Sequence, residues 1–101
     1  PLVNNLTITT NVYRVLQEFI NNSIKYANAT IISIVIIYHK TEMEIKIEDD
    51  GCGFDIDETK DNHGIGISNM QKRIEVIGGT FNLTSEINIG TKLDVKVPIS
   101  Y

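Results

Sequence analysis

The sequence predicts an α+β domain, a two-layer sandwich in which helices cover one face of a mixed, mostly antiparallel sheet. Apolar residues recur at helical spacing over residues 11–27 and again from Ile67. Apolar and charged residues alternate over 43–49, which is typical of a strand with one wet face. The elements follow in the order strand, helix, two strands, loop, helix, two strands, and this order favours the sandwich.

Length and composition limit the classes of protein to which the chain can belong. At 101 residues it is one domain, 1–101, which we interpret as a fragment of a larger protein. Its net charge of −4 argues against a nucleic-acid groove or an anionic membrane as partner. The single cysteine, Cys52, excludes an internal disulfide, and the longest apolar run, 31–38, is far too short to span a membrane. We therefore expect a cytoplasmic domain, in a parent protein that could itself be membrane-anchored.

The N-terminal part predicts a strand followed by an amphipathic helix. Residues 2–9 are apolar and β-branched in patches, so we assign them to a first strand. The N-cap candidates for the helix that follows are Thr9, Thr10 and Asn11. The helix at 11–27 carries an apolar stripe made of Val12, Leu16, Phe19, Ile20, Ile24 and Ala27.

A hairpin follows this helix. Residues 30–38 are rich in isoleucine and predict one strand, and the alternating segment 43–49 predicts its partner. Residues 39–42 form the turn between them.

The second half predicts a loop, a helix and a closing pair of strands. Apolar periodicity disappears over residues 51–66, and a loop of that length in a compact domain is usually functional or mobile. Helical spacing returns over 67–77 and ends at a Gly-Gly pair, because glycine adopts the left-handed conformation that closes a helix. Two strands, 80–86 and 91–98, complete the domain.

Two adjacent asparagines, Asn21 and Asn22, stand inside the first helix although asparagine is a poor helix former. Helix geometry places Asn22 on one face with Glu18 and Lys25, opposite the centre of the apolar stripe. This face is either plainly solvated or a ligand site, since an amide oxygen suits Mg²⁺ when phosphates and water supply the other ligands. Asn21 has no role of this kind.

Two glycine-rich segments also carry candidate chemistry. In EDDGCGFD (48–55), Asp49 precedes a G-x-G motif and could accept a hydrogen bond from an exocyclic amine such as that of adenine. Guanine would present an oxygen atom to this carboxylate instead, so Asp49 would discriminate between adenine and guanine. HGIGISNM (63–70) opens a helix, whose N–H groups and partial positive charge suit phosphate, but it matches neither a Rossmann motif nor a P-loop. The alternatives are an acidic turn and a plain loop-to-helix junction.

Taken in order, these segments resemble the ATP-binding domain of sensor histidine kinases, in the GHKL group that also holds gyrase B, MutL and heat-shock protein 90. VLQEFINNSIKYANA is similar to the asparagine box of that family, EDDGCGFD to its first glycine box and HGIGISNMQKRIEVIGG to its second. GTFNLTSEINIGTKLDVKVP is similar to its closing strand pair. The resemblance covers essentially the whole chain, points to the short-lid subfamily and implies the Bergerat fold.

The resemblance implies roles for individual residues. Asn22 would hold Mg²⁺, Glu18 would be the acid/base or metal-shell residue, and Lys25 would lie near the phosphates. Tyr26 would flank the nucleotide, and Asp49 would read the adenine amine. The other implied nucleotide-binding residues are Gly51, Gly53, Gly64, Ile65, Gly66 and Thr91.

The implied function is transfer of the γ-phosphoryl group of Mg-ATP to a histidine on a separate dimerisation domain of the same protein, with a response regulator downstream. His39 and His63 do not match the phosphoacceptor, so we expect this chain to bind ATP without phosphorylating itself and to be monomeric in isolation. The acidic loop before the second helix is expected to order over the nucleotide. Two alternatives stay open, an anti-sigma-type serine kinase and a nucleotide-binding module without catalysis.

Overall fold

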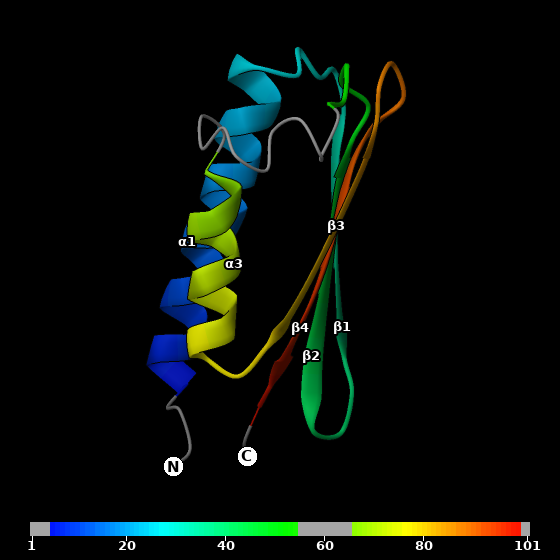
Figure 1. Cartoon of the computed structure of the whole chain (residues 1–101). Helices are drawn as coiled ribbons and strands as arrows, with labels where there is room; N and C mark the ends of the chain where they lie inside the picture. The colour runs from blue at the N-terminus through cyan, green and yellow to red at the C-terminus, as the bar shows by residue number, and fades with distance from the viewer. Residues whose placement is uncertain (1–4, 55–65, 100–101) are drawn as a thin grey trace.

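The computed structural model describes residues 5–54 and 66–99. Its elements are α1 (Asn5–Lys25), β1 (Ile32–Tyr38), β2 (Glu42–Asp49), α3 (Ile67–Val76), β3 (Thr80–Glu86) and β4 (Gly90–Pro98). The strands form one sheet in the order β1-β2-β4-β3, and the described strands pair antiparallel throughout. Helices α1 and α3 lie side by side over one face of this sheet (Figure 1). The predicted two-layer α+β sandwich is confirmed.

Helix α1 begins earlier than the sequence predicted. The strand predicted at 2–9 is wrong from Asn5 onward, where the chain is already helical, and residues 2–4 lie outside the described part. Ile8 supplies the physical reason, because its side chain is only 4% exposed and extends the buried stripe by one turn before Val12. Burial in the core outweighs the weak strand propensity of the β-branched residues.

The predicted N-cap residues lie inside α1 instead of at its start. Thr9, Thr10 and Asn11 all fall within the helix. The Asn11 side-chain amide donates to the carbonyl oxygen of Thr7 at 2.9 Å. A polar side chain inside a helix can thus bond to the preceding turn, and its presence does not mark a helix start.

The hydrophobic core lies between the two helices and the central strands β2 and β4. Its members are Ile8, Val12, Val15, Phe19, Ile45, Ile47, Met70, Ile74, Ile77, Leu93, Val95 and Val97. Each of the larger side chains contributes about 1.5–3 kcal/mol by leaving water. The stripe on α1 is rotated from the predicted one, because Val15 is buried while Ile24 is 64% exposed. This rotation decides where the polar residues of α1 lie.

The edge strand β1 is less well covered than the rest of the sheet. Ile34 and Ile36 pair with the core residues Ile47 and Ile45, yet 43% and 47% of their surfaces remain exposed. The two helices therefore leave an apolar strip uncovered along this edge. No described helix is both long enough and apolar enough to cross a membrane.

Two local devices fix the connections that frame the site. Helix α3 ends as predicted, because Gly78 adopts φ 78° and its N–H donates to the carbonyl oxygen of Glu75 at 3.0 Å. After β2, the Asp50 carboxylate accepts the backbone N–H groups of Thr30 and Ile31 at 2.8 and 2.9 Å. It also accepts a hydrogen bond from the Thr30 hydroxyl at 2.5 Å. These hydrogen bonds lower the pKa of Asp50, and the bond from the Thr30 hydroxyl has the largest effect. Asp50 thus anchors the start of β1.

Candidate functional site

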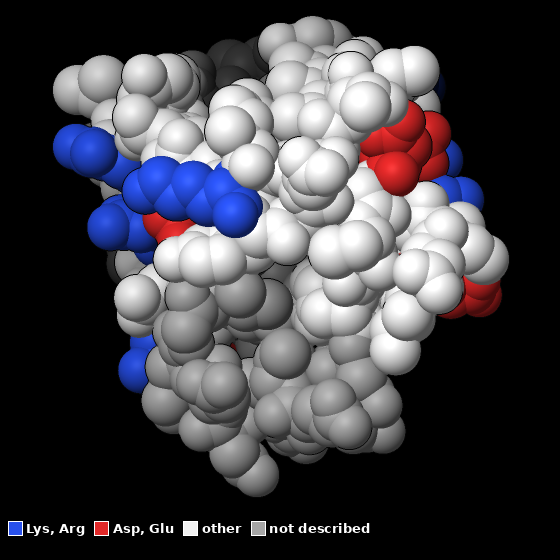
Figure 2. Space-filling model, turned by 90° about the horizontal axis from the view of Figure 1, so that it is seen from above, with Lys and Arg blue, Asp and Glu red and all other residues white. Residues whose placement is uncertain are grey.

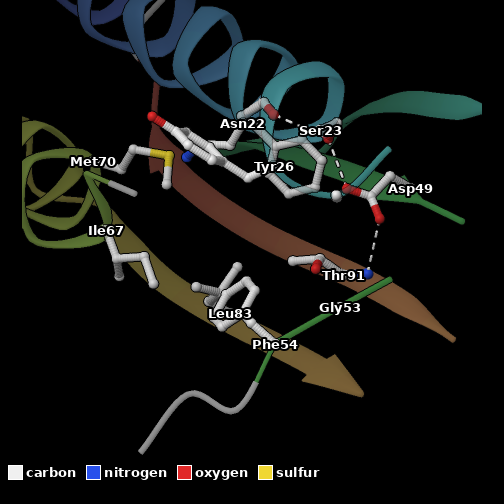
Figure 3. Close-up of a pocket in the computed structure, with 12 residues that line it drawn as sticks. Asn22, Ser23, Tyr26, Asp49, Gly53, Phe54, Ile67, Met70, Leu83 and Thr91 are labelled. Atoms are coloured by element: carbon white, nitrogen blue, oxygen red, sulfur yellow. Dashed lines mark hydrogen bonds between the residues drawn. The ribbon is translucent and has the colours of Figure 1, made fainter. Parts of the chain in front are cut away.

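A pocket opens where the C-terminal end of α1, the start of α3 and the ends of β2 and β4 meet (Figure 3). We call it the base pocket, because it contains Asp49, the residue that the resemblance predicts to bind the adenine amine. It is lined by Phe19, Asn22, Ser23, Tyr26, Ala27, Asp49, Gly53, Phe54, Ile67, Met70, Leu83 and Thr91. It contains about 490 Å³ of empty space, including solvent at its mouth.

Asp49 is the most constrained polar group of the base pocket. It ends β2 directly opposite Thr91 of β4, and its Oδ1 atom accepts the Thr91 backbone N–H at 3.1 Å. The same oxygen accepts the N–H of Gly51 at 3.0 Å. Its other oxygen, Oδ2, accepts the Ser23 hydroxyl at 2.6 Å. All three partners donate, so the carboxylate is fixed as an acceptor, with lone-pair capacity left for a ligand in the pocket.

Ser23 lines the pocket and was not among the residues predicted from the sequence. Its side chain is 1% exposed, and its Oγ also lies 3.0 Å from the carbonyl oxygen of Phe19, one turn back on α1. The signal was present in the spacing, because Ser23 follows Phe19 by four residues and so falls on the buried stripe. A serine in a core stripe needs a hydrogen-bond partner, and Asp49 is that partner.

The asparagine face of α1 lies on the flank of the buried stripe, not opposite its centre as predicted. The rotation of the stripe brings Asn22 into the base pocket, half-buried, and leaves Asn21 exposed. Tyr26, which follows the last residue of α1, also lines the pocket, although it is 60% exposed. Lys25 is exposed and does not line the pocket.

Glu18 lies against the start of α3. Gly66 precedes α3 with φ 69°, and a Cβ atom at this position would come within 2.5 Å of Glu18 Oε1. Only glycine therefore fits without displacing the carboxylate. The contact places the polar flank of α1 beside the N-terminal end of α3, whose backbone N–H groups can bind an anion.

The segment after β2 crosses the sheet end in close contact with its neighbours. Gly51 packs against Ala27, and a Cβ at Gly53, which has φ 63°, would lie 2.0 Å from the carbonyl oxygen of Glu86. The G-x-G of the first glycine-rich segment thus allows the chain to pass close to Ala27 and to the backbone of Glu86. Several predictions fall outside the described residues. They concern the ligand residues Gly64 and Ile65, the histidine His63, and the acidic loop that we expect to order over the nucleotide.

The apolar walls of the base pocket were not predicted as site residues. They come from three elements and one loop, and consist of Phe19, Phe54, Ile67, Met70 and Leu83. These walls suit a flat apolar ring, and the polar groups at one end fix its orientation.

Seen from above, the visible Lys and Arg side chains of the described residues gather mainly on the side of the helices, and the visible Asp and Glu side chains mainly on the side of the sheet (Figure 2). Within residues 5–54 and 66–99, no three His, Cys, Asp or Glu side chains gather closely enough to hold a metal ion.

Comparison with known proteins gives a consistent result. Residues 7–101 match the family model for histidine kinase-, DNA gyrase B- and HSP90-like ATPases. The chain is 36% identical over 93 residues to the oxygen sensor histidine kinase NreB of Staphylococcus carnosus, an alignment that covers 92% of this chain and 27% of that protein. It is 32% identical over 93 residues to the sensor protein VraS of Staphylococcus epidermidis, with 92% and 26% covered. The chain spans about a quarter of the length of these relatives.

Solved structures share the same architecture at lower identity. The histidine kinase AdeS of Acinetobacter baumannii superposes with a TM-score of 0.73 at 21% identity, covering 91% of this chain and 47% of that one. The ATP-binding domain of PrrB from Mycobacterium tuberculosis gives a TM-score of 0.72 at 21% identity, with 91% and 69% covered. At this level of identity the likeness establishes the fold.

Proposed function

We propose that this chain, which belongs to the family of histidine kinase-, DNA gyrase B- and HSP90-like ATPases, binds Mg-ATP in the base pocket. It is the ATP-binding catalytic domain of a two-component sensor histidine kinase. In this proposal it transfers the γ-phosphoryl group to a histidine elsewhere in its parent protein. The observation that carries this proposal is that one apolar pocket contains both the Asp49 carboxylate, held by hydrogen-bond donors, and the Asn22 amide.

The base end of the pocket fits adenine. Three donors hold the Asp49 carboxylate, so its remaining lone pairs are oriented to accept the exocyclic amine of the base. Guanine would place a carbonyl oxygen against the same carboxylate, which is unfavourable because two acceptors would face each other. Phe54 and Leu83 supply apolar surface for the ring.

The phosphate end lies between the two helices in this proposal. Asn22 is a half-buried amide that lines the pocket, and so does Ile67, the first residue of α3. Both features fit an Mg-triphosphate, in which the metal would be held by the Asn22 amide oxygen and would neutralise phosphate charge. Glu18 is the candidate acid/base group at this end, and the exposed Lys25 is a candidate partner of the phosphates.

Titration of the purified domain tests the nucleotide assignment. ATP, ADP and GTP are titrated calorimetrically with and without Mg²⁺. The proposal predicts that ATP binds at least tenfold more tightly than GTP, because one hydrogen bond to a charged group is worth about 1.5–3 kcal/mol. It also predicts that Mg²⁺ tightens ATP binding. Equal affinity for ATP and GTP would remove the role of Asp49.

Transfer is tested with the partner supplied separately. The domain and labelled ATP are mixed with the dimerisation segment of the parent protein, and the expected product carries acid-labile phosphate on histidine, which then passes to a response regulator. Acid-stable phosphate on serine would favour the anti-sigma-type kinase, and tight binding of ATP without any transfer would favour the non-catalytic module.

A further inference from the structure

Ser85 lies beside the base pocket without lining it. It stands on β3 directly opposite Thr91 of β4, in the register that places Leu83 opposite Leu93. The side chain is half-buried, as are the other alternate β3 residues that face the helices. It has no role in the nucleotide site described above.

One hydroxyl group of Ser85 joins two walls of the base pocket. Its Oγ lies 2.9 Å from Thr91 Oγ1 and accepts the backbone N–H of Phe54 at 3.0 Å. It also lies 3.2 Å from the carbonyl oxygen of Gly90, to which it can donate. Thr91 and Phe54 both line the pocket, and Thr91 lies nearer to Asp49 (Figure 3).

The single proton of Ser85 limits what Thr91 can offer. A serine hydroxyl has one hydrogen to donate and two lone pairs. When Ser85 donates to Thr91, the Thr91 hydrogen is released to donate into the pocket. When Ser85 donates to Gly90, Thr91 must donate to Ser85 and then presents only lone pairs. The orientation of Ser85 therefore sets whether Thr91 is a donor or an acceptor toward a ligand.

We propose that Ser85 is a positioning residue for recognition of the purine base: it holds the Thr91 hydroxyl and the Phe54 wall in register with Asp49. The inference rests on the proposed function. Adenine presents an acceptor ring nitrogen next to its amine, so it is matched by the Asp49 acceptor together with a donating Thr91, directly or through a water molecule. Guanine reverses both groups. Ser85 thus acts on the choice between purines through Thr91 and touches no nucleotide itself.

Substitution of Ser85 tests this inference by a change in purine preference. In Ser85→Ala the Phe54 N–H loses its acceptor and the Thr91 hydroxyl can rotate, so ATP affinity should fall about tenfold. GTP affinity should change less than threefold, so the ratio of the GTP dissociation constant to the ATP dissociation constant should fall. Ser85→Thr keeps the hydroxyl and should retain the parental ratio. Thr84→Ala is the matched control, since Thr84 is the neighbouring hydroxyl residue and is exposed on the other face of β3.

The readouts separate this inference from its premise and from a purely structural effect. If the parent domain does not bind ATP, the proposed function fails. If the parent domain binds ATP and Ser85→Ala binds both nucleotides with the parental affinities, the proposed role of Ser85 is overturned. A drop in melting temperature with an unchanged purine ratio would also overturn it. If Ser85→Ala does not fold, Ser85→Cys replaces it, because a thiol is a much weaker donor and acceptor of similar size. The same narrowing of the ratio is then required.

Discussion

Replacing Asp49 by asparagine changes one atom and reverses the hydrogen-bonding character of the base pocket. The Oδ1 position can stay a carbonyl oxygen and still accept the N–H groups of Gly51 and Thr91. The Oδ2 position becomes an amide that donates toward Ser23, whose own proton can turn to the Phe19 carbonyl oxygen 3.0 Å away. The fold should therefore survive the substitution with a melting temperature close to that of the parent.

Nucleotide binding should not survive in the same way. The amide now faces the exocyclic amine of adenine, so a charge-assisted hydrogen bond worth about 1.5–3 kcal/mol is lost and two donors face each other. At about 1.4 kcal/mol per factor of ten, ATP affinity should fall roughly 10- to 100-fold. GTP should gain relative to ATP, because the new donor matches the guanine oxygen.

Calorimetric titration of both nucleotides against Asp49→Asn measures this shift. Asp50→Asn is the matched control, because the Asp50 carboxylate is committed to Thr30 and Ile31. The control should lose stability above about pH 3.8, where the lowered pKa of Asp50 stabilises the fold, and keep its purine preference. Asp49→Asn binding ATP within twofold of the parent would refute the reasoning.

Three further substitutions follow from the same geometry. Asn22→Ala should weaken Mg-ATP binding about tenfold or more, because Asn22 lines the pocket. Asn21→Ala changes the exposed neighbouring residue and should leave binding unchanged. Calorimetry with and without Mg²⁺ checks whether the loss of affinity depends on the metal. Ser23→Ala removes a part-buried 2.6 Å hydrogen bond to a carboxylate and should lower the free energy of unfolding in urea by about 1.5–3 kcal/mol. A loss under about 0.5 kcal/mol would contradict the assigned contact. Burial, together with the neighbouring Glu44, raises the pKa of Asp94 on the outer face of the sheet, so this group costs stability once pH rises through that raised pKa. Asp94→Asn should therefore raise the melting temperature at pH 7, and the gain should vanish below the ordinary pKa of 3.8.

The sequence predicted most elements because their signals are local. The hairpin, the second helix with its glycine stop and the closing strands all lie where spacing and turn residues placed them. The first strand was wrong from Asn5 onward, since Ile8 belongs to a helical stripe whose other members lie further along the chain. Local strand propensity could not reveal this long-range burial.

The sequence pointed to polar residues of the pocket but not to the residues that support them. Asn22, Tyr26, Asp49 and Thr91 line one pocket, and their roles toward a nucleotide stay predictions. The bond from Ser23 to Asp49 joins residues 26 positions apart, and no spacing rule along one element signals it. The apolar walls are likewise ordinary core residues until the fold brings them around one cavity.

A crystal structure of the domain with Mg²⁺ and a non-hydrolysable ATP analogue tests the central claim most directly. We predict that the adenine amine donates to Asp49 Oδ2 within hydrogen-bond distance and that the metal contacts the Asn22 amide oxygen at about 2.1 Å. An analogue whose base lies away from Asp49, or a metal bound without Asn22, would contradict the account.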